Sequence, residues 1–195
     1  MQMVDPDAEA VEARLRSGQI ACADCGGELR PWGFARWRTV RDHGRALRLR
    51  PRRSVCRGCA VTHVLLPTVL LARRVDVATV IGEALHAHFV SGSTQEKVAE
   101  AAGVPVDTAR RWLRRFGANA AELREGFLAL AHRLDPRLGP LEPRGSPPLD
   151  ALEAIGAAGA AAVRRLGPAP LWWFVSGASG GRLLSNTSCT VGGFA

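Results

Sequence analysis

Four of the chain's five cysteines lie in two Cys-x-x-Cys pairs, Cys22-Ala-Asp-Cys25 and Cys56-Arg-Gly-Cys59. Thirty residues without another cysteine separate the two pairs. A two-residue gap lets a tight turn direct both sulfur atoms of a pair at one ion, and two such pairs supply the four thiolates of a tetrahedral Zn²⁺ site. The spacing therefore predicts one Zn²⁺ per chain, held by Cys22, Cys25, Cys56 and Cys59.

Four cysteine ligands would close the coordination shell and leave no position for water or substrate, so the predicted zinc is structural rather than catalytic. Small residues beside the cysteines, Gly26, Gly27 and Gly58, allow backbone N–H groups to approach the sulfur atoms. The alternatives are a redox dithiol, a chain without metal, and replacement of one thiolate by His63, four residues after Cys59.

The segment from Thr94 to Leu113 has the pattern of a helix-turn-helix. Ser93-x-x-Glu96 predicts a capping box for a helix over residues 94–102, and Gly103 permits the left-handed turn that ends it. A second helix is expected over residues 106–116. The residues at the positions where the two helices would pack are small or apolar: Val98, Ala99, Val104, Ala109 and Trp112.

The second helix carries a polar face typical of a recognition helix. Its first two turns present Val106, Asp107, Arg110 and Arg111, and the two arginines are the predicted guanine contacts in the major groove. Arg114 and Arg115 lie further along and are predicted to contact phosphates. The alternative is an ordinary helical hairpin within a core, which four arginines in six residues disfavour.

Arginines are also concentrated between the two cysteine pairs. From Arg30 to Arg74 the chain has twelve arginines and one acidic residue, Asp42. Residues 32–41 and 45–53 are predicted strands joined by the turn Asp42-His43-Gly44. A basic β-ribbon can lie against phosphates or enter a groove, and the predicted DNA contacts are Arg45, Arg48, Arg50 and Arg52. The alternative is a solvated charged face, and Trp32 and Trp37 are expected in the core of the ribbon.

Composition favours an anionic partner, nucleic acid before a membrane surface. The 195-residue chain has a formal net charge of +8 and an isoelectric point near 10.7. No stretch reaches the roughly 18 apolar residues of a membrane span, and the acidic amino terminus does not resemble a secretory signal. We therefore expect a cytoplasmic, nucleoid-associated protein whose paired cysteines bind metal. Cys189 stands apart and is expected to be an inert thiol.

The predicted fold class is α+β, mainly α. An N-terminal zinc β-ribbon is followed by a helical helix-turn-helix domain and by an Ala-rich, partly disordered C-terminal region. The expected parts are a leading helix (1–19), the zinc ribbon with its Arg-rich hairpin (20–70), the helix-turn-helix domain (75–135), a Pro/Gly linker (136–148), and an Ala-rich helix with a flexible tail (149–195). Within the third part, Asp76 is the expected N-cap of the first helix, and residues 106–116 and 120–134 are expected to form separate helices.

No catalytic constellation is recognised. Two-metal cleavage of nucleic acid needs clustered carboxylates, and after the predicted helix-turn-helix the sequence offers only scattered acids, among them Glu122, Glu125, Asp135, Glu142, Asp150 and Glu153. The sequence also lacks a phosphate-binding loop that ends in Gly-Lys-Ser/Thr. The stretch after Phe116 is short for the usual catalytic fold of transposases. We therefore expect a protein that is not an enzyme.

The order of these modules resembles the amino-terminal half of insertion-sequence transposases. The resemblance covers residues 20–117. It is carried by Cys22-x-x-Cys25-Gly, the arginine-rich hairpin, Cys56-x-x-Cys59 followed by Val61-Thr-His-Val-Leu-Leu-Pro67, and the segment from Gly92-Ser to Arg114-Arg115-Phe116. The chain is similar in particular to an uncharacterised bacterial family, a domain of unknown function that joins a zinc ribbon to a transposase-type helix-turn-helix without a catalytic core. The resemblance implies double-stranded DNA as partner, near mobile elements.

The leading hypothesis is a sequence-specific DNA-binding protein, a transposase-like accessory factor or regulator that works with DNA and with a transposase or recombinase. One alternative is a DNA-binding subunit or remnant of a transposase that acts with a separate catalytic chain. A second alternative, from another class, is a protein–protein adaptor in which the zinc is structural and the helical hairpin only packs.

Overall fold

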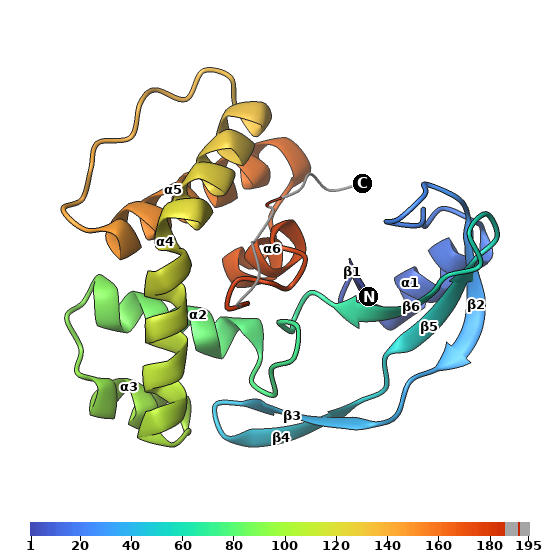
Figure 1. Cartoon of the computed structure of the whole chain (residues 1–195), viewed down its shortest axis with the longest axis horizontal. Helices are drawn as coiled ribbons and strands as arrows, with labels where there is room; N and C mark the ends of the chain where they lie inside the picture. Colours follow the sequence, from blue (N-terminus) through green and yellow to red (C-terminus); the bar gives the residue numbers. More distant parts are fainter. Residues whose placement is uncertain (186–190, 192–195) are drawn as a thin grey trace.

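The computed structural model describes residues 1–185 and residue 191, and has mixed α/β content (Figure 1). Strands dominate the N-terminal part: β1 (Gln2–Val4), β2 (Leu29–Phe34), β3 (Arg38–Asp42), β4 (Arg45–Leu49), β5 (Arg52–Cys56) and β6 (Thr62–Pro67). One helix, α1 (Ala8–Arg16), lies among them, and five follow: α2 (Ala78–Phe89), α3 (Gln95–Ala102), α4 (Val106–Leu134), α5 (Pro147–Leu166) and α6 (Leu171–Ala178). No described helix has the length and apolar content needed to cross a bilayer.

A four-stranded sheet has the order β1-β6-β5-β2, with β1 parallel to β6 and the other pairs antiparallel. The two long strands expected over residues 32–41 and 45–53 are each interrupted. Gly33 has φ of +83° at a register shift between β2 and β5, and Pro51 has no N–H with which to continue a ladder. The distal parts become a separate hairpin, β3–β4, whose turn residues His43 and Gly44 both have positive φ, as a tight two-residue turn requires.

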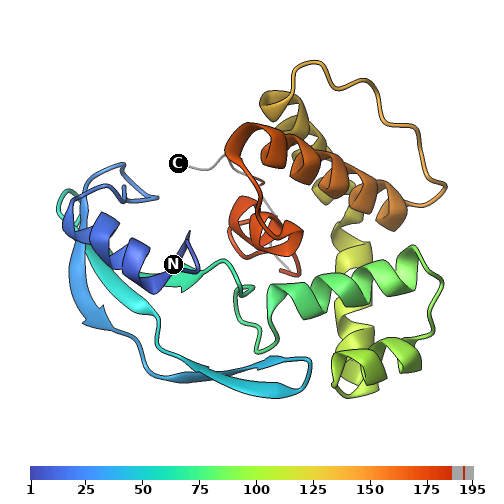
Figure 2. The same ribbon diagram turned by 180° about the vertical axis from the view of Figure 1, so that it is seen from behind.

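The hairpin extends from the sheet and reaches the helices (Figures 1 and 2). Arg41 pairs with Asp76 through two hydrogen bonds of 2.8 and 3.0 Å, and the backbones of the same residues form a parallel β-bridge. At the tip, His43 Nε2 lies 2.8 Å from Glu83 of α2. The turn also approaches Gly103, where an added Cβ would lie 3.1 Å from the Gly44 backbone. The hairpin and the α3–α4 turn therefore form one continuous surface.

Two N-cap predictions are wrong. Asp76 is buried, and its carboxylate binds Arg41 rather than the helix that follows, so α2 has Val77 at its N-cap and no side-chain cap. The ion pair satisfies the buried charge, which a cap alone would not do. At α3, Thr94 rather than Ser93 is the N-cap, and its hydroxyl accepts a hydrogen bond from the Lys97 N–H.

The separate helices expected over residues 106–116 and 120–134 are one continuous helix, α4. Phe116, Ala120, Leu123 and Phe127 are all fully buried at helical spacing, so a single apolar stripe crosses the expected break. Gly117 at that break costs only about 1 kcal/mol relative to alanine, which this burial outweighs. The small side chains of α5 let it pack closely against α4, and its buried face consists of Ala151, Ala154, Ile155, Ala158, Gly159, Ala161 and Ala162.

The expectation of a flexible, partly disordered C-terminal tail is wrong for residues 171–185. Leu171–Ala178 form α6, which lies between the N-terminal strands and the α4–α5 pair (Figure 2). Its Trp172, Phe174 and Val175 join the main core, and Ser176 Oγ donates a hydrogen bond to the Leu70 carbonyl. The Gly/Ser-rich composition after Val175 suggested a loose segment, but the apolar residues 171–175 and residues 176–185 pack against the rest of the chain. Cys189 and the other residues of the predicted tail at 186–190 and 192–195 lie outside the described residues.

Gly82 of α2 lies against Trp172 of α6 so closely that an added Cβ would overlap the indole ring. We expect Gly82→Ala to lower the free energy of unfolding by about 1–3 kcal/mol, because the ring must move out of a packed core. The matched control is Gly156→Ala on the exposed side of α5, where an added Cβ would meet no atom within 4 Å. It should leave stability unchanged or raise it by up to about 1 kcal/mol, as urea denaturation can measure. Equal effects of the two substitutions would contradict the packing of α2 on α6.

The contact at the hairpin tip is expected to depend on pH. Hydrogen bonds to Glu83 and then to Asp42 raise the pKa of His43 above its ordinary value. A pKa raised by folding contributes stability that is complete below the unfolded value, about 6.5, and is lost as pH rises through the folded value. Because the His43 side chain is 49% exposed, its contribution is about 1 kcal/mol or less.

We therefore expect His43→Asn to destabilise the protein most at pH about 5.5 and least at pH about 8.5, in urea titrations followed at both values. Asparagine is a suited replacement because it does not titrate and tolerates the positive φ of 46° at this position. A stability difference that is the same at both pH values would show that the His43 contact is not electrostatic.

Candidate metal centre and basic surface

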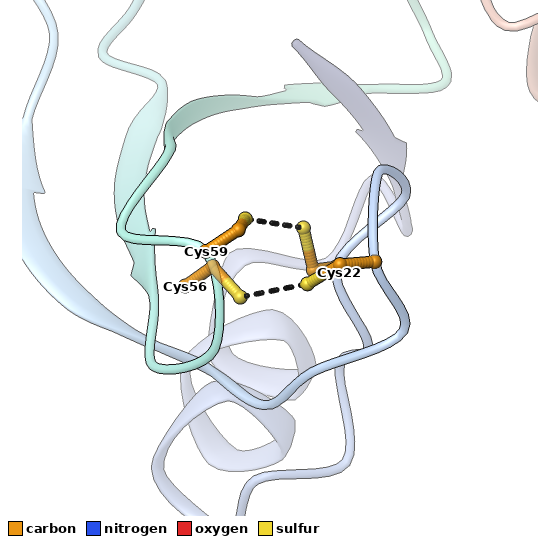
Figure 3. Close-up of side chains that lie close together, drawn as sticks. Cys22, Cys56 and Cys59 are labelled. Atoms are coloured by element: carbon orange, nitrogen blue, oxygen red, sulfur yellow. Dashed lines mark hydrogen bonds between the residues drawn. The ribbon is translucent and has the colours of Figure 1, made fainter.

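The four cysteines with metal-ligand spacing lie together in the structure. Cys22 and Cys25 come from the loop between α1 and β2, whereas Cys56 ends β5 and Cys59 lies in the turn before β6. The Sγ atoms of Cys22 and Cys59 are 3.8 Å apart, those of Cys25 and Cys56 are 3.4 Å apart, and all four lie within 4.8 Å of one another. Figure 3 shows the sulfur atoms of the labelled Cys22, Cys56 and Cys59 within one small cluster.

The two cysteine-bearing turns have the same hydrogen bonds. In the first, Cys22 N–H donates to the Gly27 carbonyl at 2.7 Å and Gly26 N–H donates to the Cys22 carbonyl at 2.9 Å. The corresponding bonds of the second turn join Cys56 to Val61 at 2.9 Å and Ala60 to Cys56 at 3.1 Å. The fifth residue of each turn has positive φ, 73° at Gly26 and 59° at Ala60. Each turn therefore directs its sulfur atoms into the same space in the same way.

Backbone N–H groups also approach the sulfur atoms, and of the three glycines expected to allow this, Gly58 does so, whereas the Gly26 N–H donates to the Cys22 carbonyl. The Asp24 N–H lies 3.4 Å from Cys22 Sγ, and the Gly58 N–H lies 3.3 Å from Cys56 Sγ. Such donors stabilise thiolates and offset the negative charge of a four-thiolate site.

The donor set fits a tetrahedral metal ion. Metal–sulfur bonds of about 2.3 Å place the sulfur atoms of a tetrahedron about 3.8 Å apart, close to the two separations observed. Four clustered cysteines, two of them buried, therefore provide the donor atoms of a metal site.

Two of the thiols have shifted pKa values in opposite directions. Hydrogen bonds from the backbone of Cys59, from Cys25 and from the backbone of Gly58 outweigh burial and lower the pKa of Cys56 to about 7. The Val61 N–H lowers the pKa of Cys59, but the neighbouring sulfur of Cys25, burial and the sulfurs of Cys56 and Cys22 raise it to about 12. One thiolate forms readily and the next is opposed by its neighbours, so a bound cation would stabilise the full set of thiolates.

His63, the predicted alternative ligand, is buried beside the cluster. Its Nε2 atom lies 3.3 Å from Cys22 Sγ and 3.9 Å from Asp24 Oδ2. The Nδ1 atom has no hydrogen-bond partner among the described residues. With four sulfur atoms already together, Nε2 is placed to donate a hydrogen bond to the Cys22 thiolate, a supporting contact that fixes the orientation of a ligand. Cys22, Asp24 and His63 also form a second group with metal-ligand spacing.

The apolar core near the cysteines is small. One buried cluster of seven residues lies there, separate from the main core of the helices, and two of its members are cysteines: Val11, Leu15, Ile20, Cys22, Leu29, Cys56 and Leu65. So little apolar burial contributes little stability, and a bound metal is the usual replacement in small domains.

The predicted helix pair is α3, a turn at Gly103 and the start of α4. Gly103 has φ 64° and ψ 38°, and the Val104 N–H donates to the Ala99 carbonyl at 3.0 Å. The expected packing residues Val98, Ala99, Ala109 and Trp112 are buried, which confirms that part of the sequence prediction. Val104 is partly buried against the same core.

The predicted contact residues of α4 divide between two adjacent rows. Asp107, Arg110, Arg111 and Arg114 are exposed, and Val106 and Arg115 are half-buried. Arg110 donates to Gln95 of α3 at 3.0 Å and to Asp107 at 2.8 Å, so its guanidinium is held in place with further N–H donors free of these two bonds. At helical spacing Arg110 and Arg114 form one row along α4, and Arg111 and Arg115 form the adjacent row.

The tryptophans expected in the ribbon core are on the surface. Trp32 and Trp37 are each 57% exposed, and Phe34 is 51% exposed. Val40 of β3 is the residue of this ribbon that packs into the main core, and Trp32, Phe34 and Trp37 lie outside it. The guanidinium of Arg48 lies 5.0 Å from the Trp37 ring centre, and that of Arg50 lies 5.1 Å from the Phe34 ring centre.

The predicted hairpin contacts are therefore not equivalent. Arg45, Arg48 and Arg50 are exposed, whereas Arg52 is largely buried and binds the carboxylate of Glu12 at 2.7 Å. Hydrogen bonding to Arg52 lowers the pKa of Glu12. Because its charge is already paired, Arg52 is a structural residue rather than a free contact for an anion.

The structure brings together a third group of arginines that the sequence reasoning did not connect. A cavity of about 300 Å³ is lined by arginines from three regions, Arg41 of β3, Arg73 and Arg74 before α2, and Arg111 and Arg115 of α4. The Arg73-Arg74 pair is visible in the sequence, but no spacing rule links it to a helix more than thirty residues further along.

Comparison with known proteins finds no family model, no curated protein and no solved structure that matches this chain. The resemblance to the amino-terminal half of transposases thus stays a prediction that rests on the residues themselves.

The crowding at the cysteines allows a matched test. An added Cβ at Gly27 would lie 3.1 Å from Cys56 Sγ and 3.3 Å from Cys25 Sγ, whereas at Gly58 the nearest sulfur would be 3.5 Å away, an ordinary contact. We expect the purified, reduced protein to carry about one metal ion per chain. Gly27→Ala should bind the ion about tenfold more weakly, and Gly58→Ala should bind nearly as the wild type does, in competition with a coloured chelator. Equal affinities of the two variants would contradict this arrangement of the sulfur atoms.

Proposed function

We propose that the protein is a sequence-specific DNA-binding protein, a transposase-like accessory factor or regulator that binds without cutting. The observation that carries this proposal is the juxtaposition of α3, the Gly103 turn and the exposed arginines of α4 with the arginine-rich hairpin, whose tip touches Gly103. A helix presented in this way fits the major groove of B-DNA, which is about 12 Å wide.

Arg110 is the best candidate for reading a base. Gln95 and Asp107 hold its guanidinium, and a held guanidinium loses less entropy when it binds the two acceptor atoms of guanine. Arg114, one helical turn further on the same side, is exposed and suited to a second contact with a base or a flanking phosphate.

The hairpin supplies a second basic surface beside the helix. Its exposed arginines, Arg45, Arg48 and Arg50, lie on the same continuous surface as the α3–α4 turn because the hairpin tip is fixed there. The aromatic rings of Trp37 and Phe34 beneath Arg48 and Arg50 hold the guanidinium groups in place. Phosphates on either side of a groove are the natural ligands of such a surface.

The metal in this proposal is one structural Zn²⁺. The supporting observations are four cysteine ligands, which leave no open position, and the small apolar core beside them. When bound, the ion supplies folding energy to the N-terminal strands and does no chemistry on a substrate. Metal analysis of the purified protein identifies the ion, and a chelator should unfold the N-terminal part before the helices.

A second candidate is the protein–protein adaptor. The exposed aromatic residues Trp32, Phe34 and Trp37 favour it, because aromatic residues and arginine are enriched in the centres of protein interfaces. The same residues also suit contact with nucleic acid, and the net charge of +8 favours the anionic partner.

The test is selection of bound duplexes from a random pool, followed by affinity measurements between about 50 and 200 mM salt. We expect a steep loss of affinity with salt. Arg110→Ala should cost about 1–3 kcal/mol on the selected site and relax the preference at one base pair, while binding to random DNA changes little.

The same mixtures with Mg²⁺ or Mn²⁺ should leave the DNA intact. Reproducible strand cleavage that follows the purified protein would overturn the proposal of binding without catalysis. A weak dependence on salt with no selected sequence would instead favour the adaptor.

A further inference from the structure

The arginine cavity has little acidic charge to balance its arginines. Five arginines line it, and the one carboxylate in the lining, Asp76, is already bound through both oxygens by Arg41. Thr108 and Trp112 of α4 complete one wall. Four guanidinium groups thus surround a space of about 300 Å³ with no acidic side chain of the lining left to pair them.

The backbone of the C-terminal segment holds two of these arginines in position. The Leu184 carbonyl accepts hydrogen bonds from Arg74 at 2.7 Å and from Arg115 at 3.4 Å. Asn119 of α4 in turn donates to the Ser185 carbonyl at 2.8 Å, so this segment is fixed to α4. A neutral carbonyl orients the guanidinium groups without cancelling their charge, which is the arrangement of a prepared anion site.

Arg74 is the arginine of this cavity in the least favourable environment. Its Nε atom is buried and has no hydrogen-bond partner among the described residues. Burial, followed by the positive charges of Arg115 and Arg111, lowers the pKa of Arg74. The half-buried Arg74 guanidinium beside other positive charges is unfavourable unless an anion joins them, and its buried N–H donor without an acceptor adds to the penalty.

We propose that this cavity binds a phosphate group. Guanidinium forks match the oxygens of phosphate in pairs, and the cavity is large enough for one or two linked phosphates. For DNA as ligand the proposal rests on the proposed function. Arg111 then clamps a backbone phosphate beside the groove rather than reads a guanine, because it shares a side of α4 with Arg115 and lines the cavity with it.

Free phosphate and DNA phosphodiester are two sources of the same chemistry, and the experiment treats them separately. The first arm measures binding of inorganic pyrophosphate by isothermal titration calorimetry to the full chain without DNA. The double variant Arg111→Gln/Arg115→Gln removes two charges from the cavity. Its matched control, Arg124→Gln/Arg133→Gln, removes two charges from the other half of α4. We expect the cavity variant to lose about tenfold or more in affinity and the control to lose little.

The second arm measures affinity for the selected DNA duplex and for random DNA against salt concentration. The cavity variant should weaken binding to both duplexes alike. The slope of the logarithm of affinity against the logarithm of salt concentration should become shallower by about one to two, because one or two fewer phosphates are neutralised. Circular dichroism spectra that match the wild type confirm that the variants are folded. Arg73→Asn, at the exposed rim of the cavity, is a further variant that removes one charge from the cavity without changing α4. Asparagine tolerates the positive φ of 59° at this position.

The outcomes separate the two proposals. Pyrophosphate binding that depends on Arg111 and Arg115, in a protein that binds no DNA, would support the phosphate site and overturn the DNA-binding function. DNA binding that the cavity variant and Arg73→Asn leave unchanged would exclude DNA as the ligand of the cavity and keep the function, and the same result without pyrophosphate binding at the cavity would overturn the phosphate site. Equal loss of pyrophosphate affinity in the cavity variant and the control would also overturn it, since only net charge would then matter.

Discussion

The ion pair between Arg41 and Asp76 is the constraint on which the rest of the surface depends. Asp76 is 3% exposed, so its carboxylate needs a partner, and Arg41 satisfies both oxygen atoms from a hairpin that otherwise extends into solvent. The backbone bridge between the same residues and the contact of Gly44 with Gly103 then leave the hairpin one orientation. A flexible basic ribbon would pay an entropic cost on meeting an anion, whereas a fixed one presents its charges in a set geometry.

The cysteine cluster and the main core are two different solutions to the same problem of stability. The helices bury a continuous apolar core in which alanines and glycines permit close approach, as at Gly82 against Trp172 and along α5. The separate cluster beside the cysteines, formed by α1, the loop after it and the strands, has seven buried residues, too few to stabilise a domain without help. Two turns with identical hydrogen bonds point four sulfur atoms at one another, which is unfavourable once the thiols ionise and favourable once a cation is bound.

Local patterns were readable from the sequence, and long-range partners were not. The cysteine spacing, the turn at Gly44, the left-handed Gly103 and the buried Val98 and Trp112 follow from rules that act over a few residues. Asp76 looked like a helix cap because its true partner, Arg41, lies 35 residues away. The tail looked loose because its partners, among them Leu70 and Asn119, come from distant segments of the sequence. Trp32 and Trp37 were expected in the core because their side chains are hydrophobic, but whether such a side chain is buried depends on which distant segments pack against it.

The arginines show most clearly what packing adds to composition. In the sequence each arginine contributes one positive charge and none can be told apart from its neighbours. In the fold they differ in burial and in the groups that they contact. Arg52 is neutralised by Glu12, Arg41 by Asp76, and Arg48 rests on an aromatic ring. Arg74, Arg111 and Arg115 meet around one cavity without an acid to balance them. The buried Nε atom of Arg74 has no hydrogen-bond partner among the described residues, and Arg111 and Arg115 add positive charge beside it, so a bound anion would stabilise these three arginines more than the paired ones.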